Sequence, residues 1–263
     1  RKLKKNDLLL LDSGGQYKWG TTDVTRTICF SMISKRIKNI FTRVLKGHIA
    51  VALTDIKKEI NVVTNFIDIN KFTHDFTDCQ RAMMATDKEK IITHISNMRE
   101  VKRIPDVIKV FYNIQKEIPA KLLMIGDGPE KNKAEKKAKR LGIKDKVIFF
   151  GKSNETNKIL SFTDLFLLPS EIESFGLSAL EAMAAKVPVI SSNTGGIPEV
   201  NINNFSGRLS DVGDIEKMTN DAIEILSDKN LHKTFKMNAR KRAEDFDIHK
   251  IVPKYENIYN NLN

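Results

Sequence analysis

Two carboxylates separated by seven residues carry the clearest chemical signal in this sequence. They are Glu173 and Glu181, in the run Glu-Ser-Phe-Gly-Leu-Ser-Ala-Leu-Glu. The pattern predicts that Glu173 lies in a loop and that a helix begins near Phe175, so that Glu181 lies about two turns into the helix. The free backbone N–H groups of Phe175, Gly176 and Leu177 would then form an anion site, because a helix start is electropositive and glycine lets a phosphate approach closely.

The distance between this helix start and Glu181 suits a nucleotide. Phe175 and Glu181 are six positions apart, which corresponds to roughly 9 Å along a helix axis. A diphosphate at the helix start would place its ribose hydroxyls against the Glu181 carboxylate, and Glu173 would accept hydrogen bonds from a sugar. The alternative is an ordinary helix capped by Ser174 with Glu181 in solvent, and the spacing alone leaves both possibilities open.

The carboxylates lie in a region of alternating strand and helix patterns that begins near Lys90. Apolar runs typical of buried strands occupy 91–95, 121–125, 146–150, 164–168 and 187–191. Amphipathic helix patterns occupy 103–117, 130–141, 155–161 and 175–185, and a helical tail covers about 215–261. Repeated β-α units of this length imply a parallel sheet with helices on both faces. We therefore expect an α/β fold with a Rossmann-like parallel sheet.

Small and polar residues follow each predicted strand. They stand at 96–99, 126–129, 151, 169–176 and 192–196. Ligands of such folds bind outside the carboxyl ends of the strands, where these loops would meet. Turn formation explains the glycines of any single loop equally well, whereas five such loops at one edge of a sheet favour a binding site.

The first 55 residues follow a different pattern. A strand is predicted at 8–11, a hairpin-like turn at 12–20 and a second β-rich run at 21–30. The apolar stripe of one helix follows, formed by Ile37, Ile40, Phe41, Val44, Leu45, His48, Ile49 and Ala52. One hairpin and one helix are too few to bury a core, so we expect that the surface which would cover the stripe is missing.

The composition limits the class of function. Lys and Arg total 44 and Asp and Glu 33, a net charge of +11 over 263 residues. The cations are spread along the chain, which suits a small anionic ligand as well as a nucleic acid. Cys29 and Cys79 form no disulfide framework, and no apolar run approaches the roughly 20 residues of a membrane span. We expect a soluble, cytoplasmic protein that binds neither nucleic acid nor membranes.

Several motifs in residues 90–263 are familiar. In order along the chain they are Gly-Asp-Gly-Pro at 126–129, Val-Ile-Phe-Phe-Gly at 147–151, the Glu-x7-Glu pattern at 173–181 and Gly-Gly-Ile-Pro-Glu at 195–199. This region resembles the C-terminal, nucleotide-sugar-binding domain of the GT-B retaining glycosyltransferases of family 4. The runs 93–103, 167–176 and 190–196 are similar to the branch of that family that transfers N-acetylglucosamine to L-malate in bacillithiol biosynthesis, and this similarity begins near Ile60.

The resemblance implies a UDP-sugar donor, UDP-N-acetylglucosamine, and a small hydroxy-acid acceptor, L-malate, without a metal or other cofactor. It implies that Arg99 and Lys102 bind the donor diphosphate, since the charge on the leaving group must be stabilised. Cations beside a helix start are unfavourable unless an anion lies near, which agrees with this role. The remaining implied substrate contacts are Glu173 to the sugar, Phe175, Gly176 and Leu177 to the phosphates, Glu181 to the ribose, Gly151 to the uracil, and Asn97 and Ser174 in the same loops.

Residues 7–55 resemble another family, the pita-bread metallopeptidases of aminopeptidase P type, through the runs 11–17, 20–27 and 43–50. In that family the carboxylates corresponding to Asp12 and Asp23 bind two divalent metals. The further His and two Glu that the ligand set requires belong to a longer downstream domain, whose place is taken here by the glycosyltransferase-like sequence. Two carboxylates cannot hold a two-metal hydrolytic site, so we expect no metal and an orphaned hairpin.

We therefore expect two parts, a peptidase-like fragment at 1–55 and a glycosyltransferase C-terminal domain at 56–263, joined near 54–59. A fused or truncated gene product that lacks its acceptor domain is expected to be weak or inactive alone. A peptidase fragment and a non-catalytic nucleotide-sugar-binding domain remain the alternatives. His94 lies in a predicted strand and is expected to be structural or near the domain cleft. His48 lies on the apolar stripe and is expected to be a packed histidine rather than a ligand. The remaining histidines form no metal-binding spacing; they are His74, His232 and His249.

Overall fold

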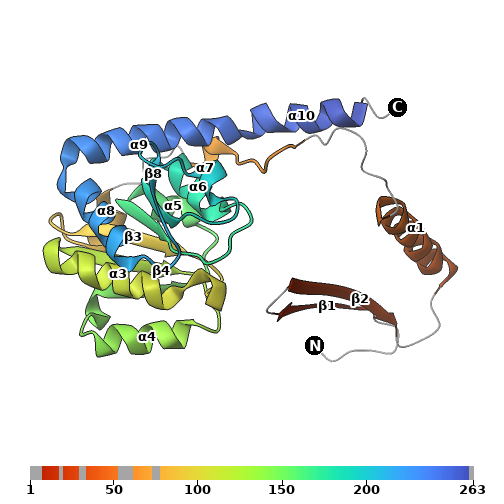
Figure 1. Cartoon of the computed structure of the whole chain (residues 1–263), viewed down its shortest axis with the longest axis horizontal. Helices are drawn as coiled ribbons and strands as arrows, with labels where there is room; N and C mark the ends of the chain where they lie inside the picture. Colours follow the sequence, from red (N-terminus) through yellow and green to blue (C-terminus); the bar gives the residue numbers. More distant parts are fainter. Residues whose placement is uncertain (1–7, 18–19, 30–33, 53–61, 73–77, 261–263) are drawn as a thin grey trace. The chain divides into compact units, whose positions relative to one another are not determined.

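The computed structural model describes residues 8–17, 20–29, 34–52, 62–72 and 78–260. The chain divides into two compact units, Arg1–Val62 and Val63–Asn263 (Figure 1). The junction expected near 54–59 and the side chains of His48 and His74 lie outside the described parts. The two units are described separately below.

The first unit contains a hairpin and one helix. Strand β1 (Leu8–Tyr17) pairs antiparallel with β2 (Gly20–Cys29) in an unbroken register that runs from Leu8 opposite Cys29 to Tyr17 opposite Gly20. The turn predicted over 12–20 is therefore wrong in extent, because residues 12–17 belong to the strand. Gly14 and Gly15 suggested a loop, but Gly14 pairs with Asp23 and Gly15 with Thr22. Strand pairing accommodates glycine at a modest entropic cost.

Helix α1 (Lys35–Ala52) follows where the apolar stripe predicted it. Five large apolar side chains of the stripe are 44–67% exposed, and Ile37 is half-buried. The five are Ile40, Phe41, Val44, Leu45 and Ile49. The sequence thus has the pattern of a buried helix face, and within the described residues of the unit this face is uncovered.

The second unit is built on a six-stranded parallel sheet in the order β5-β4-β3-β6-β7-β8. The strands are β3 (Lys90–Ile95), β4 (Ala120–Ile125), β5 (Val147–Gly151), β6 (Leu165–Leu168), β7 (Val189–Ser192) and β8 (Gly207–Ser210). This confirms the predicted α/β class. The chain moves outward from β3 to one edge and then from β6 to the other, so the topological switch point lies between β3 and β6, where ligands of open α/β sheets bind.

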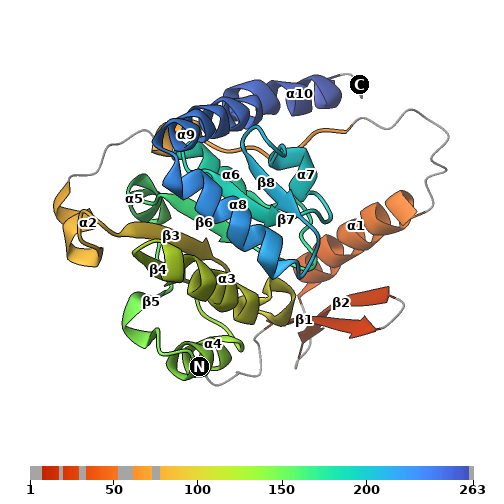
Figure 2. The same ribbon diagram turned by 60° about the vertical axis from the view of Figure 1, so that its left-hand side comes forward.

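Helices cover both faces of this sheet (Figures 1 and 2). The helices in the described part of this unit are α2 (Asp78–Met84), α3 (Ile104–Glu117), α4 (Lys131–Arg140), α5 (Thr156–Ser161), α6 (Leu177–Ala184), α7 (Ile197–Val200), α8 (Ile215–Ser227), α9 (Lys229–Ala243) and α10 (Ile248–Asn260), of which α10 continues from α9 past the sheet. The described residues also form short 3₁₀ helices, which are η1 (Ile69–Phe72), η2 (Glu100–Lys102), η3 (Lys144–Lys146) and η4 (Glu244–Phe246). Helix α6 begins two residues later than predicted, because Gly176 takes a left-handed φ of 91° and ends the preceding loop.

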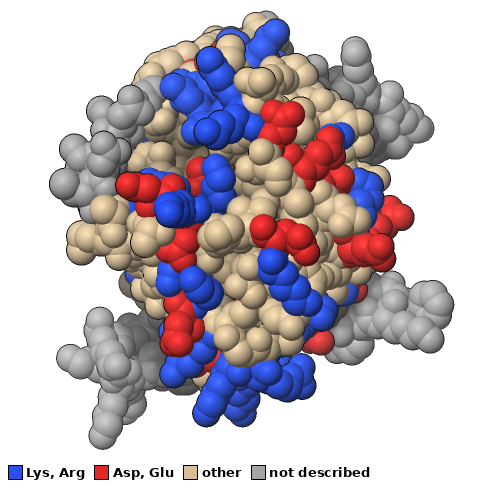
Figure 3. Space-filling view, turned by 90° about the vertical axis from the view of Figure 1, so that its left-hand side faces the viewer, with Lys and Arg blue, Asp and Glu red and all other residues tan. Residues whose placement is uncertain are grey.

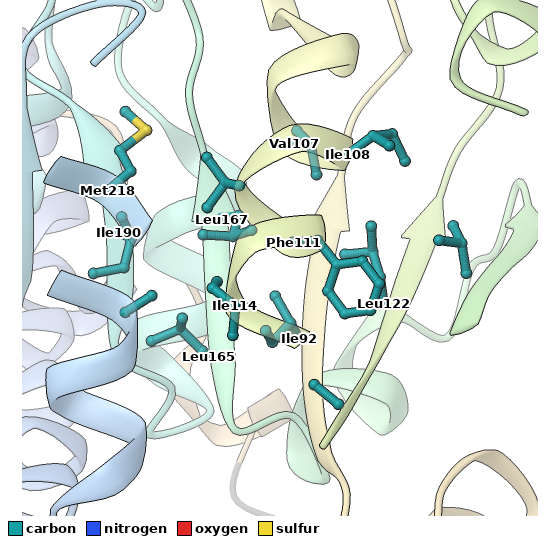
Figure 4. Packing of buried hydrophobic residues seen from close by; sticks show 14 of the residues in the cluster. Ile92, Val107, Ile108, Phe111, Ile114, Leu122, Leu165, Leu167, Ile190 and Met218 are labelled. Carbon is teal, nitrogen blue, oxygen red and sulfur yellow. The ribbon is translucent and has the colours of Figure 1, made fainter. Parts of the chain in front are cut away.

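The core lies on both faces of the sheet. On one face Phe111 of α3 packs over Ile92 and Leu122 of the strands, together with residues of α8 (Figure 4). On the other face Phe166 and Leu180 belong to a second cluster formed by β6, β7, α6 and α9. Both faces of the strands are apolar and buried, which is why the strands appear in the sequence as continuous apolar runs.

Candidate functional site

The loops after β3 and β4 lie in direct backbone contact at the carboxyl edge of the sheet. A Cβ atom added to Gly126 would lie 1.8 Å from the Ser96 carbonyl oxygen, and one added to Gly128 would lie 2.0 Å from that of Asn97. Only glycine allows this approach, so the Gly-Asp-Gly-Pro run sets the path of the loop that carries Asn97 and Arg99. Both of these side chains are exposed. Among the described residues, the Arg99 guanidinium has no ion-pair partner and remains available to an anion.

The structure brings Lys102 and Glu173 together. Lys102 Nζ forms an ion pair with Glu173 Oε2, and the two side chains are only 18% and 14% exposed. The backbone supports the pair, because the N–H of Glu171 donates to the carbonyl of Val101 at 2.8 Å. The two residues are 71 positions apart, so sequence spacing could not reveal the contact. The pair spans the topological switch point, since Lys102 follows β3 and Glu173 follows β6.

The Gly-Gly turn after β7 holds the Glu173 loop in place. The N–H of Gly196 donates to the Glu173 carbonyl at 2.9 Å. A Cβ atom on Gly195 would lie 2.1 Å from that carbonyl oxygen, and one on Gly196 would lie 2.2 Å from the Ser174 carbonyl oxygen. This supporting contact was not predicted from the sequence. Ser174 itself is exposed and is not the N-cap of α6, a position that Gly176 occupies.

Side chains at the start of α6 lie either in the core or on the wall of a pocket. Phe175 is buried and packs edge-on against Phe246, with ring centroids 5.7 Å apart, so its side chain belongs to the core. Leu177 and Glu181 instead line a pocket of about 420 Å³. Burial raises the pKa of the Glu181 carboxyl above its ordinary value. A partly desolvated carboxylate on a pocket wall is well suited to accept hydrogen bonds from ligand hydroxyls.

The remaining wall of this pocket was missed by sequence reasoning. It comes from the start of the second unit, from the segment around α5 and from the start of α10. Its residues are Phe66, Ile67, Asp68, Lys71, Phe72, Asn154, Thr156, Asn157 and Ile248. Asn154, Thr156 and Asn157 follow the glycine that ends β5, and amide-rich loops after a strand are a signal that could have been used. Gly151 itself has a φ of 73°, and its carbonyl accepts from the Gly126 N–H at 2.7 Å.

The charge distribution favours a small ligand. On the face shown in Figure 3, cations and carboxylates alternate in several groups rather than forming one continuous basic band. In the parts of the chain that the structure describes, no cluster of His, Cys, Asp and Glu has the makeup of a metal site. No helix within the same residues is long and apolar enough to cross a membrane.

Comparison with known proteins places the chain in a family. The family model for glycosyl transferases group 1 matches residues 78–242. The N-acetyl-alpha-D-glucosaminyl L-malate synthase of Bacillus anthracis is 45% identical over 204 residues, which cover 77% of this chain and 54% of the relative. The D-inositol 3-phosphate glycosyltransferase of Mycolicibacterium smegmatis is 29% identical over 180 residues, covering 65% and 40% respectively. The chain thus spans about half the length of the curated relatives it matches.

Solved structures give the same fold. HepE of Anabaena, crystallised with UDP and glucose, superposes with a TM-score of 0.70 at 22% identity, covering 76% of this chain and 57% of its own. TarM of Staphylococcus aureus, crystallised with fondaparinux, alpha-GlcNAc-glycerol and UDP, superposes with a TM-score of 0.67 at 26% identity, covering 81% and 42%. These similarities confirm the expected GT-B type fold.

The amino-terminal residues match a second family. The model for metallopeptidase family M24 covers residues 1–77, which agrees with the resemblance seen in the sequence. In the hairpin, Asp12 pairs in register with Thr25 and Asp23 with Gly14. The M24 match covers less than a third of the chain, whereas the transferase match covers more than half of it. The chain therefore belongs to the glycosyl transferases group 1.

Proposed function

We propose that this chain carries the donor half of a transferase that moves N-acetylglucosamine from UDP to the hydroxyl of L-malate, with retention at the anomeric carbon. The observation that carries the proposal is the 45% identity to an N-acetyl-alpha-D-glucosaminyl L-malate synthase over 77% of this chain. The bond between the anomeric carbon and the diphosphate oxygen breaks, and a bond to the malate oxygen forms. The malate hydroxyl proton leaves with the departing UDP.

The leaving diphosphate gains negative charge as its bond to the sugar breaks, and the site must stabilise that charge. Arg99 can bind phosphate oxygens bidentately, and Lys102 acts as a compact point charge. The ion pair with Glu173 fixes where the Lys102 ammonium lies before the donor arrives. Through the same pair, Lys102 would hold the Glu173 carboxylate toward the donor sugar, so one contact would arrange the two catalytic groups. The backbone N–H groups of Phe175, Gly176 and Leu177 at the start of α6 add further donors for the phosphates.

The nucleoside occupies the pocket beside α6. Glu181 accepts hydrogen bonds from the ribose hydroxyls, and Asn154 and Asn157 provide amide groups on the same wall. Gly151 offers backbone groups to the uracil, while Asn97 and Ser174 lie in the loops that face the phosphates and the sugar. TarM, whose solved structure contains UDP, supports a uridine nucleotide as the ligand of this fold.

The malate acceptor needs a pocket of its own beside the donor site. The described residues of the first unit form a hairpin and a helix, and a dicarboxylate would need a basic pocket facing the donor sugar. Holding donor and acceptor in register contributes roughly 7–11 kcal/mol to a two-substrate reaction. We therefore expect measurable binding of UDP by the purified 263-residue chain but very weak transfer to malate.

A thermal-shift experiment tests the donor site. The melting temperature is measured for the wild-type chain and for two variants, each with UDP, with UDP-N-acetylglucosamine and with Mn²⁺ alone. The test variant is Glu181→Ala. The control is Glu135→Ala, which removes an exposed carboxylate on α4. At ligand concentrations near a hundred times Kd, the nucleotides should raise the melting temperature of wild type and control by about 5–10 °C without metal. Glu181→Ala should respond much less. An absent response to both nucleotides would refute the donor site, and a Mn²⁺-dependent shift with cleavage of a proline-containing peptide would favour the peptidase alternative.

A further inference from the structure

A histidine that takes no part in the proposed chemistry lies directly beneath the donor site. His94 is in β3, and its side chain is fully buried. Its Nδ1 atom lies 2.8 Å from the carbonyl oxygen of Leu167 in β6, and its Nε2 atom lies 2.8 Å from Ser96 Oγ. The ring therefore joins the two strands that flank the topological switch point and contacts the loop that leaves β3.

The partners of the ring fix its protonation. A backbone carbonyl only accepts, so Nδ1 must carry the proton and donate it to Leu167. Burial and, to a smaller extent, the charge of Lys102 lower the pKa of His94 to about 4, although the hydrogen bond to Leu167 acts in the opposite direction. The ring is therefore neutral at physiological pH, and Nε2 is an acceptor. The Ser96 hydroxyl must then donate to Nε2. This direction leaves a lone pair of Ser96 Oγ free to accept from the Met98 N–H, which lies 3.1 Å away.

Met98 is the strained residue of the loop. Its φ is +42°, a left-handed value that costs a side-chain-bearing residue about 1–3 kcal/mol unless the surroundings hold it. Its side chain is fully buried, and its carbonyl accepts from the Glu130 N–H at 2.9 Å. The bond from its own N–H to Ser96 is thus the link between the strained residue and β3. Asn97 and Arg99 stand on either side of it.

We propose that His94 is a positioning residue for the donor diphosphate, acting through the Ser96 hydroxyl to hold Met98 in its left-handed conformation and so to fix Asn97 and Arg99. The inference rests on the proposed function for its ligand, and on the hydrogen-bond chain from Leu167 to Met98 for its mechanism. Ser96 is the middle link of that chain, and His94 touches no substrate.

Two substitutions of His94 by amide side chains test its two hydrogen bonds separately. In His94→Asn the side-chain nitrogen takes the place of Nδ1 and keeps the bond to Leu167, but nothing reaches Ser96. In His94→Gln the side-chain oxygen takes the place of Nε2 and keeps the bond to Ser96, but Leu167 loses its donor. Each variant loses one buried hydrogen bond, so both should melt at similarly lowered temperatures. A purely structural role would make their UDP affinities equal.

UDP titration calorimetry on the full chain gives the decisive contrast. His94→Asn should weaken UDP binding about three- to tenfold, the equivalent of one hydrogen bond, and His94→Gln should stay within about twofold of wild type. Ser96→Ala should match His94→Asn, and the double variant should be no weaker than either single one, since both remove the same link. Equal affinities of the Asn and Gln variants, or additive losses, would overturn the proposal.

Nuclear magnetic resonance tests the hydrogen-bond chain from Leu167 to Met98 in the absence of nucleotide. Proton–nitrogen correlation spectra of the imidazoles at pH 7 should show His94 as the Nδ1–H tautomer, and the Met98 amide should exchange slowly in wild type and His94→Gln but faster in His94→Asn and Ser96→Ala. An Nε2–H tautomer, or unchanged Met98 exchange in all variants, would refute the chain. If wild type binds no UDP while these signals are as expected, the proposed function fails and the role of His94 in shaping the loop stands.

Discussion

Helices α1 and α3 have the same amphipathic pattern and different environments. In α3 the apolar residues Ile104, Val107, Ile108, Phe111 and Ile114 are fully buried against the parallel sheet. In α1 the corresponding residues are 44–67% exposed among the described residues. The comparison teaches that spacing of apolar residues predicts a helix, whereas its stabilisation depends on a partner surface that the spacing does not contain. Most of the stability of a helix in a protein comes from such packing.

Matched phenylalanine substitutions in the two helices should give the largest difference in the free energy of unfolding. Phe111→Ala removes a fully buried ring from the main core and should lower the free energy of unfolding by about 3–5 kcal/mol. Phe41→Ala removes a ring that is 54% exposed on α1 and should change it by less than about 0.5 kcal/mol. Urea denaturation of both variants measures the contrast. A large loss in Phe41→Ala would mean that α1 has a partner surface in solution.

Matched glycine substitutions in the two units should change the free energy of unfolding in opposite directions. Gly195→Ala places a Cβ atom 2.1 Å from the Glu173 carbonyl oxygen at a φ of +52°, and should cost about 1–3 kcal/mol and weaken UDP binding. Gly47→Ala in α1 meets nothing within 4 Å and replaces a helical glycine, so it should stabilise the helix by up to about 1 kcal/mol. Denaturation and far-ultraviolet circular dichroism read out the two effects. Unchanged UDP affinity in Gly195→Ala would separate this turn from the donor site.

Acid should weaken the second unit through Glu89. The Lys146 ammonium at 2.9 Å and the N–H of Thr86 at 3.1 Å lower the pKa of Glu89 to about 2. The folded state releases this proton more readily than the unfolded state, so the stabilisation is complete above about pH 4.5 and is lost as the pH falls towards 2. Glu89→Gln should cost about 1–2 kcal/mol at pH 7 and nothing near pH 2. A difference that persists unchanged at pH 2 would contradict the assignment. Helix α1 contains no acidic residue and serves as the internal contrast.

The smallest expected effect on the stability of the second unit concerns Glu181. Because burial raises its pKa, keeping it ionised at neutral pH lowers the stability of the folded state. Glu181→Gln should therefore slightly raise the melting temperature at pH 7, with no gain below the ordinary carboxyl pKa, while UDP affinity falls about ten- to a hundredfold. A melting temperature that falls in parallel with affinity would show that Glu181 supports the fold rather than the ligand.

The fold was predictable wherever long apolar runs specify it. Strands β3 to β7 lie within two residues of their predicted starts because each is an apolar run bounded by turn residues. Strand β8 (Gly207–Ser210) was missed, since its four residues include a glycine and an arginine and form no such run. Helix α7 is equally short, and neither pattern extends over enough residues to show a period. In the first unit, glycines that suggested a turn are paired strand residues instead.

The candidate site was predictable only in part. Glu173, Glu181, Arg99 and Lys102 came from motif spacing and family resemblance, and their roles remain predictions. The supporting contacts depend on residues far apart in the chain, such as Lys102 with Glu173, or His94 with Leu167 at a separation of 73 positions. Local patterns contain no information on such pairs, because register and strand order decide which side chains meet.

Hydrogen–deuterium exchange with and without saturating UDP compares the two units directly and tests the central claim. The account predicts slower exchange in peptides covering 96–102, 151–157 and 173–181, the loops at the carboxyl edge of the sheet, and unchanged exchange in 8–52. Glu181→Ala at the same UDP concentration should show little protection. Protection of the hairpin and α1, or no protection of the three loops in wild type, would contradict the assignment of the donor site to the second unit.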